Sequence, residues 1–198
     1  MLKKIYQNIS LLILATLISC FNYMTANANN NDILNKIPSN IGKENVMIIH
    51  LKYGPVIIEM LPKVAPKHVE RIKTLISKGF YDGIVFHRVI EGFMAQTGDP
   101  TGSGMGGSKL PDLNAEFSNE PHIRGTLSMA RATNVNSANS QFFIVTKDSK
   151  YLDGQYTVWG RVISGMEYVD KIKKGVDGSG IVNNPDKMIK VVIAKDIK

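Results

Sequence analysis

The run Phe86–Gln96 reads Phe-His-Arg-Val-Ile-Glu-Gly-Phe-Met-Ala-Gln and places one permanent cation among aromatic and apolar side chains. If residues 86–90 form a strand, Phe86, Arg88 and Ile90 share one face, because side chains alternate along a strand. An arginine among apolar neighbours is costly unless it pairs with an acid or lines an accessible groove. Arg88 is therefore either half of a structural ion pair or a donor that serves a ligand.

The neighbours of this arginine favour a ligand site. Phe93 and Met94 bring apolar surface, and Gln96 brings a neutral donor and acceptor. The segment Gln141–Ile144, Gln-Phe-Phe-Ile, repeats that mixture of amide and aromatic groups. An apolar pocket with a few polar groups is the general form of a small-ligand site.

Groups for covalent or acid–base chemistry do not stand out. The four histidines show no metal-ligand spacing, and His87, in an apolar strand, is interpreted as structural. Ser128 and Ser140 lack the context of a nucleophile elbow, and no pair of carboxylates is evident. Cys20 is the only cysteine. We therefore expect neither a metal nor a cofactor, and a chemistry based on binding and electrostatics.

The segment Gly102–Gly107 matches the glycine pattern of a dinucleotide-binding loop, but its surroundings do not fit. Such a loop follows a buried strand and opens a helix. This one follows a turn, Thr97-Gly-Asp-Pro-Thr, and Pro111 soon afterwards opposes a helix. Ser108-Lys109 also has the two phosphate-loop residues in reverse order. A loop that lets another chain approach its backbone closely is the favoured interpretation.

Many short strands and two helices must position these residues. Residues 65–78 are predicted to form a helix, with Pro66 at its first turn and Gly79 at its end; residues 167–174 are a shorter candidate. A hairpin turn is expected at Tyr53–Pro55. The predicted strands are residues 46–51, 56–61, 84–90, 93–97, 126–130, 141–146, 156–162 and 188–194. The pattern predicts a mainly β protein, a closed antiparallel barrel with helices covering its ends.

Residues 1–28 have the features of a signal peptide: Lys3 and Lys4, an apolar run over residues 9–18, and an Ala-Asn-Ala cleavage site. An uncleaved anchor is an alternative, although the run is short for a membrane span. Leu-Ile-Ser-Cys, ending at Cys20, also resembles a lipoprotein box, which would anchor the protein by a lipid. Each route exports the chain, and the expected location is the periplasm. Residues 29–45 are expected to be a flexible segment, and residues 46–198 the folded domain.

Charge and composition restrict the partners. The chain has 198 residues, 43% of them hydrophobic, and a net charge of +7, or +5 without the two leader lysines. The basic residues are scattered, which favours a solvated surface over a nucleic-acid site. We expect a monomer that meets membranes only through its leader or a lipid on Cys20.

Taken together, these motifs resemble the cyclophilin family. The family pattern F-H-R-V-I-x-G-F-M-x-Q-x-G-D is met over residues 86–99, and the glycine loop follows at Gly104–Gly107. The blocks at residues 125–131, 139–144 and 151–154 then come in family order and at family spacing. The resemblance spans about residues 46–198 and implies an eight-stranded barrel with two helices. It also implies a peptidyl-prolyl cis-trans isomerase, whose partners are proline-containing segments of polypeptides.

The resemblance assigns roles to individual residues. It implies that Arg88 is the main catalytic residue. The residues implied to bind substrate are Phe93, Met94, Gln96, Ala130, Arg131, Ala132, Gln141, Phe143, Tyr151, Leu152 and Tyr156. Among these, Phe93, Met94, Phe143 and Leu152 match the proline pocket.

Three positions depart from the best-known eukaryotic pattern. Tyr151 stands where that pattern has a tryptophan that contacts cyclosporin, Tyr156 replaces a histidine, and Arg131 replaces an asparagine. We therefore expect weak cyclosporin binding and a substrate preference particular to this groove. A module that holds proline-containing segments without turnover is the alternative to an enzyme.

Overall fold

The computed structural model describes residues 30–197, so the predicted signal peptide and Cys20 lie outside the described residues. Residues 37–196 form one compact unit, and residues 30–35, which belong to a separate unit, are helical. Within the segment predicted to be flexible, a 3-10 turn, η1 (Lys43–Asn45), leads directly into the first strand at Val46. No helix among the described residues is long and apolar enough to cross a membrane.

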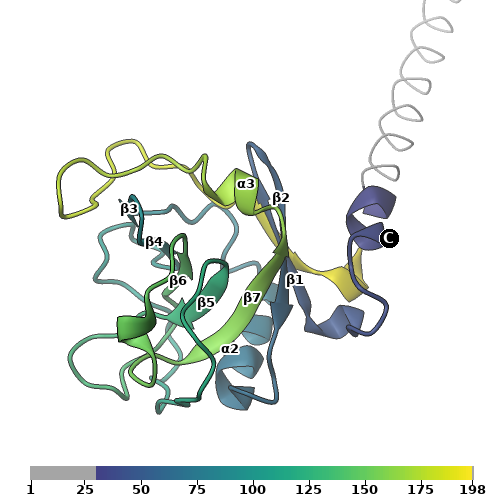
Figure 1. Cartoon of the computed structure of the whole chain (residues 1–198), viewed down its shortest axis with the longest axis horizontal. Helices are drawn as coiled ribbons and strands as arrows, with labels where there is room; N and C mark the ends of the chain where they lie inside the picture. The colour runs from purple at the N-terminus through teal and green to yellow at the C-terminus, as the bar shows by residue number, and fades with distance from the viewer. Residues whose placement is uncertain (1–29, 198) are drawn as a thin grey trace, which may run out of the picture. The chain divides into compact units, whose positions relative to one another are not determined.

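Eight strands form one antiparallel sheet in the order β3-β4-β6-β5-β7-β2-β1-β8. Sequence neighbours β1 and β2 pair as a hairpin, whereas β5 lies beside β7 only through long-range pairing (Figure 1). The strands are β1 (Val46–Leu51), β2 (Gly54–Met60), β3 (Arg88–Ile90), β4 (Met94–Thr97), β5 (Thr126–Met129), β6 (Phe142–Val145), β7 (Val158–Ser164) and β8 (Lys190–Ile193).

The first hairpin turns one residue earlier than predicted. Leu51 pairs with Gly54, so Lys52 and Tyr53 alone form the loop. Gly54 has a φ of +145°, and a Cβ at this position would lie 2.6 Å from the ring of Tyr168. Glycine is therefore required here, because the ring packs directly on the strand.

The prediction of a closed barrel is wrong: the sheet is a curled half-barrel in which β3 and β8 remain its two edges. Of the predicted strand at residues 84–90, only the last three residues pair in the sheet. The other edge of β3 is instead covered by irregular chain, since Val89 N donates to Gly180 O and Val182 N donates to His87 O. These bonds satisfy backbone N–H and C=O groups that would pair with β8 if the barrel were closed.

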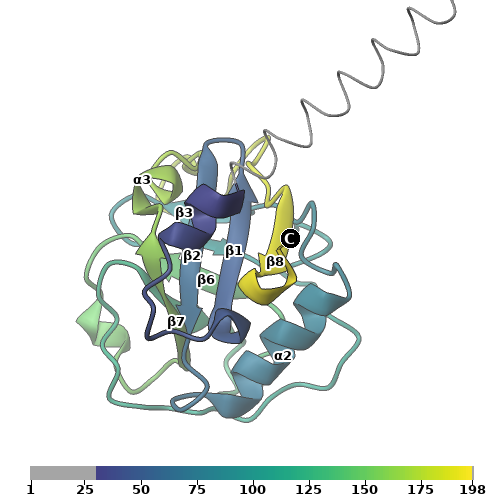
Figure 2. The same cartoon turned by 90° about the vertical axis from the view of Figure 1, so that its right-hand side faces the viewer.

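The helices cover the sheet only in part. The helix α2 (Pro66–Ser77) begins and ends within one residue of its predicted bounds, with Glu116 accepting hydrogen bonds from the backbone N–H groups of Lys67 and His68. It packs beside β8 (Figure 2). The helix α3 (Met166–Val169) is a single turn and ends before the predicted residue 174, because Lys173 N donates to the Asp186 carboxylate instead.

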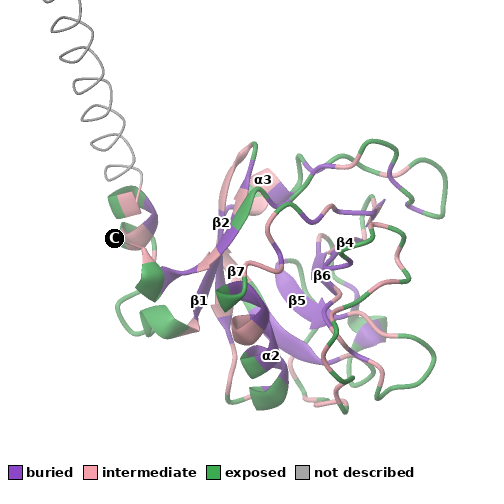
Figure 3. Cartoon of the chain, turned by 180° about the vertical axis from the view of Figure 1, so that it is seen from behind, coloured by how far each residue is buried: buried purple, intermediate pink, exposed green. Residues whose placement is uncertain are grey.

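Among the described residues, apolar side chains gather in two clusters. The larger is the core between the sheet and α2, where the strands are buried along most of their length (Figure 3). The smaller consists of Met94, Phe143, Val145 and Leu152, against which half-buried Phe93 and Tyr156 pack. Part of the second cluster is open to solvent, and it forms the apolar part of the site described below.

Candidate functional site

Strand register aligns three of the predicted site residues in one row. Arg88 pairs with Gln96 across β3 and β4, and Gln96 pairs with Phe143 across β4 and β6. Directly opposite residues in antiparallel strands point to the same face. The side chains of Arg88, Gln96 and Phe143 therefore stand side by side, although 55 positions separate the first from the last in the sequence.

Amide groups hold Arg88 in place. Its Nε donates to Ser179 O at 3.0 Å, and its Nη1 donates to Gln96 Oε1 at 3.4 Å. Gln96 Nε2 in turn donates to Gln141 Oε1 at 2.9 Å. No carboxylate forms an ion pair with Arg88 among residues 30–197. The alternative of a structural ion pair is therefore excluded, and guanidinium donors remain free for a ligand.

Beside Arg88 lies a cavity of about 240 Å³ that is walled by the smaller apolar cluster. Phe143 and Leu152 are almost fully buried, at 5% and 8% exposure, so their positions are fixed by packing. The cavity is lined by Arg88, Phe93, Met94, Gln96, Ala130, Arg131, Phe143, Leu152 and Tyr156. A small cavity that combines apolar walls with two guanidinium groups and an amide suits a compact ring that carries a polar bond.

Arg131 and Tyr156 form one wall of this cavity. The Arg131 guanidinium lies 4.5 Å from the centre of the Tyr156 ring, within the range of cation–π attraction. Its Nη1 donates to Ala132 O and its Nη2 donates to Gln155 O, both at 3.0 Å. The guanidinium thus ties the chain after β5 to the chain before β7.

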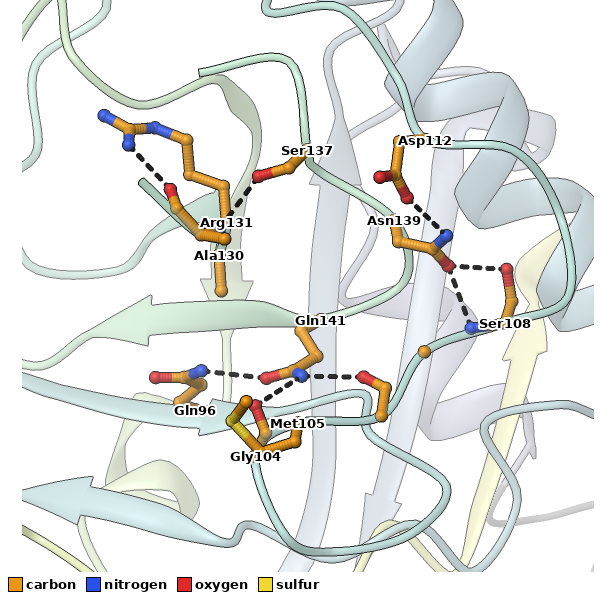
Figure 4. A pocket seen from close by; sticks show the side chains of 13 residues that line it. Gln96, Gly104, Met105, Ser108, Asp112, Ala130, Arg131, Ser137, Asn139 and Gln141 are labelled. Carbon is orange, nitrogen blue, oxygen red and sulfur yellow. Dashed lines mark hydrogen bonds between the residues drawn. The ribbon is translucent and has the colours of Figure 1, made fainter. Parts of the chain in front are cut away.

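A larger cavity of about 500 Å³ adjoins the first and shares Gln96, Ala130 and Arg131 with it (Figure 4). Two predicted binding residues, Ala132 and Gln141, line this cavity and not the smaller one. Tyr151 lines neither: it is 65% exposed and packs its ring 5.8 Å from that of Phe93. The rest of the lining consists of three loop glycines and of five residues that the sequence prediction missed: Met105, Ser108, Asp112, Ser137 and Asn139.

The glycine-rich loop forms the far side of the larger cavity, and Asp99 organises it. The Asp99 carboxylate accepts hydrogen bonds from the backbone N–H groups of Thr101, Gly104 and Gly106 at 2.6 to 3.1 Å. Burial of the carboxyl acts to raise the pKa of Asp99, but the hydrogen bonds from Thr101 and the two glycines outweigh it and lower the pKa to about 2.

Three backbone N–H groups that a phosphate would need are therefore already bonded within the protein. The loop does not have the geometry of a nucleotide site, as its sequence context indicated. Gln141 Nε2 also donates to the carbonyls of Gly104 and Gly106, at 3.0 and 2.8 Å, and this joins the loop to Gln96 and Arg88.

Behind the smaller cavity lies a hydrogen-bonded series that the sequence did not reveal. His122 is fully buried, with Nδ1 2.9 Å from Asp153 Oδ1 and Nε2 3.1 Å from Ser128 Oγ. Its ring stacks on Phe143 at 6.4 Å and meets Tyr156 edge-on at 6.5 Å. His122 therefore supports two cavity walls, a role that depends on long-range packing and has no signature in the local sequence.

Ser128, His122 and Asp153 are linked by hydrogen bonds in the same order as the triad of a serine hydrolase. The burial of the serine excludes nucleophilic catalysis. Ser128 is 0% exposed, and its hydroxyl donates to Thr157 O at 2.9 Å. A nucleophile must reach the substrate and give its proton to the base. Here the three side chains instead fix the position of the imidazole ring.

Comparisons with known proteins agree with this geometry. A family model described as cyclophilin type peptidyl-prolyl cis-trans isomerase/CLD matches residues 46–195. A probable peptidyl-prolyl cis-trans isomerase of Brucella suis biovar 1 (strain 1330) is 55% identical over 167 residues, which cover 78% of this chain and 85% of that protein.

Solved structures show the same similarity. The crystal structure of the cyclophilin AquaCyp293 from Hirschia baltica has a TM-score of 0.72 at 27% identity, covering 80% of this chain and 77% of that one. A Cryptosporidium parvum cyclophilin type isomerase, crystallised in the presence of the dipeptide Ala-Pro, has a TM-score of 0.69 at 31% identity, covering 75% and 98%. The chain therefore belongs to the cyclophilin-type peptidyl-prolyl cis-trans isomerases, enzymes that turn the X-Pro bond without a covalent intermediate.

Proposed function

We propose that the enzyme accelerates X-Pro isomerisation in exported proteins, and that Arg88 acts by donating a hydrogen bond to the prolyl nitrogen. The peptide bond resists rotation with a barrier of roughly 18–20 kcal/mol, because its C–N bond is partly double. X-Pro bonds populate both isomers and interconvert slowly. Isomerisation can therefore limit the folding of a chain that arrives unfolded.

The mechanism follows from what changes as the bond twists. In the planar ground state the prolyl nitrogen shares its lone pair with the carbonyl, and in the twisted state it keeps that pair. A donor aimed at the nitrogen therefore stabilises the twisted state more than the planar one, which is the condition for catalysis. Lowering the barrier by about 7 kcal/mol accelerates the reaction roughly 10⁵-fold.

The arrangement around Arg88 is the observation that carries this proposal. No acid within the described part of the chain neutralises Arg88, and two acceptors, Ser179 O and Gln96 Oε1, orient its guanidinium beside the 240 Å³ cavity. In this proposal, the proline ring occupies that cavity between Phe93, Met94 and Phe143 while the preceding carbonyl rotates. Because the guanidinium is oriented before the peptide binds, it does not have to be ordered during the reaction.

Substitution of Arg88 tests the role. We expect Arg88→Ala to lower kcat for an X-Pro peptide about 10²–10³-fold, the usual effect of removing a donor that acts in the transition state. Peptide affinity should change far less, and Arg88→Lys should recover only part of the rate because it lacks the planar fork. Proline-limited refolding of a reporter protein gives the same comparison on a folding chain. Unaltered rates would leave a binding module as the remaining role for the groove.

The exported location rests on the leader alone, which lies outside the described residues. Lys3, Lys4 and the apolar run at residues 9–18 support secretion, and Ala26–Ala28 supports cleavage before Asn29. The intact mass of the mature protein tests this. A start at Asn29 supports a free periplasmic protein, a lipid-modified Cys20 supports an anchored one, and an uncut chain in the cytoplasmic fraction contradicts export.

A further inference from the structure

Met105 differs from the other methionines in its exposure. It is 91% exposed, and Met166 is half-buried. The remaining methionines among residues 30–197 are at most 1% exposed: Met47, Met60, Met94, Met129 and Met188. Because oxidation of a thioether requires contact with the oxidant, the exposure of Met105 makes it the most reactive of these side chains.

This exposure is imposed by a fixed backbone. Gln141 Nε2 binds the carbonyls on both sides of Met105, those of Gly104 and Gly106. The N–H groups of the same two glycines donate to Asp99. A Cβ on Gly106 would lie 2.2 Å from Asp99 Oδ1, so the chain approaches the carboxylate as closely as glycine permits. The loop therefore holds the Met105 side chain out in water.

The position of Met105 connects it to the substrate groove. It lines the 500 Å³ cavity together with Ala130 and Ala132, and Figure 4 shows its sulfur on the same side of the cavity as Gln96 and Gln141. That cavity shares Gln96 and Ala130 with the cavity beside Arg88. Because the cavities share these residues, a peptide whose proline occupies the smaller cavity reaches the larger one with a residue close to that proline.

We propose that Met105 is a modification site: its oxidation by a peroxide to the sulfoxide weakens the binding of peptides that place an apolar side chain in the larger cavity. The effect on peptides rests on the proposed function, whereas the selectivity of oxidation rests on exposure alone. A thioether is apolar and flexible, and the sulfoxide is polar. An apolar contact therefore becomes a polar group that must be desolvated when the peptide binds.

The chemical step needs only the peroxide as co-reactant. A lone pair of the sulfur attacks one peroxide oxygen, so that an S–O bond forms as the O–O bond breaks. The oxygen that joins the sulfur loses its proton, and the second oxygen takes up a proton and leaves as water. The sulfur is oxidised by two electrons and the peroxide is reduced by two.

Peptide mapping tests the site itself. The full-length protein is treated with limiting hydrogen peroxide and digested, and the sulfoxide at each methionine is quantified by mass spectrometry against time. Among the methionines that the structure describes, Met105 should be oxidised first, with Met94, in the neighbouring cavity wall, as the internal comparison. Equal rates at Met105 and Met94 would overturn the proposal. Oxidation of Cys20 appears in a separate peptide.

Kinetics test the consequence. For a peptide with leucine two residues before proline, oxidation should raise KM about three- to tenfold, the loss expected from part of one apolar contact, and leave kcat unchanged. A matched peptide with serine at that position should be less affected. Met105→Leu keeps an apolar side chain without sulfur, so its KM should not respond to peroxide, while Met105→Gln should imitate the oxidised protein.

The outcomes separate the two proposals. An equal peroxide effect on wild type and Met105→Leu would place the sensitive group elsewhere and refute the role of Met105. An unchanged KM despite complete oxidation of Met105 would refute it too. An untreated protein with no isomerase activity would instead contradict the proposed function, while peptide mapping would still test the modification site.

Discussion

Asp99 should contribute a part of the stability that depends on pH in a defined way. Its pKa falls from an ordinary 3.8 to about 2 on folding. Each tenfold change in proton affinity is worth about 1.4 kcal/mol, so this carboxylate stabilises the fold at pH 7 by about 2 kcal/mol. Because the folded pKa is the lower one, the contribution is complete above pH 3.8 and is lost as the pH falls through 2.

Asp99→Asn removes this contribution while keeping the shape of the side chain. We expect the free energy of unfolding at pH 7 to be about 2 kcal/mol lower than that of wild type. At pH 3 this difference between the two proteins should be smaller by about 1 kcal/mol. Urea unfolding measures both quantities, with the fluorescence of Trp159, the single tryptophan and fully buried, as the probe. Other carboxyl groups titrate in both proteins, so the difference between the two curves isolates Asp99.

Asp112→Asn is the matched control, because it removes a carboxylate that lines the larger cavity but, within residues 30–197, accepts only one hydrogen bond, from Asn139. It should lower stability at pH 7 by less than about 0.5 kcal/mol. A gap between Asp99→Asn and wild type that stays constant from pH 7 to pH 3 would refute the reasoning. An Asp99→Asn protein as stable as wild type at pH 7 would do the same.

Further predictions concern the rest of the site and the surface. Gln141→Glu keeps the size of the side chain but loses both donors to the loop carbonyls, so kcat/KM for an X-Pro peptide should fall about tenfold; an unchanged value would mean that the loop does not depend on this amide. Phe143→Ala should destabilise the protein by about 3 kcal/mol in urea unfolding, because the ring is 5% exposed and leaves a cavity. Arg124→Ala breaks a bidentate pair with Asp170 that is nearly half exposed, so it should cost less than about 1 kcal/mol and even less in high salt, and a loss above 2 kcal/mol would contradict this assignment.

Sequence patterns predicted correctly those elements whose bounds depend on residues close together in the chain. The strand at Val46–Leu51 was predicted with its observed bounds, since its apolar run ends at a turn. The helix α2 was predicted within one residue at each end, because Pro66 fits the first turn and Gly79, at a φ of +65°, follows its end. Both features depend on residues that are close in sequence.

Long-range pairing explains the errors. Residues 84–90 are as apolar as a strand, yet their backbone bonds to the chain between Gly180 and Met188, which no local pattern predicts. This chain lies along residues 83–89, and β3 and β8 remain the two edges of an open sheet. The second helix is shorter than its pattern because the Asp186 carboxylate takes the N–H of Lys173.

In the site, too, residues in local motifs were predicted and roles that depend on tertiary contacts were not. The sequence pointed to Arg88, Phe93, Gln96 and Phe143, and strand register and packing place them around one cavity. It did not reveal that His122 supports this cavity, because that role arises from tertiary contacts with two rings. The resemblance placed Tyr151 in the groove, and the structure shows its exposed ring packed on Phe93, outside the lining of both cavities.

The role of Arg88 is tested most directly by the rate at which a bound X-Pro peptide exchanges between cis and trans, measured by NMR exchange spectroscopy at saturating peptide. At saturation the rate reports the bound reaction and not affinity. We predict that Arg88→Ala slows this exchange about 10²–10³-fold while the peptide still binds. Exchange in Arg88→Ala as fast as in wild type would contradict the proposal that Arg88 lowers the rotational barrier.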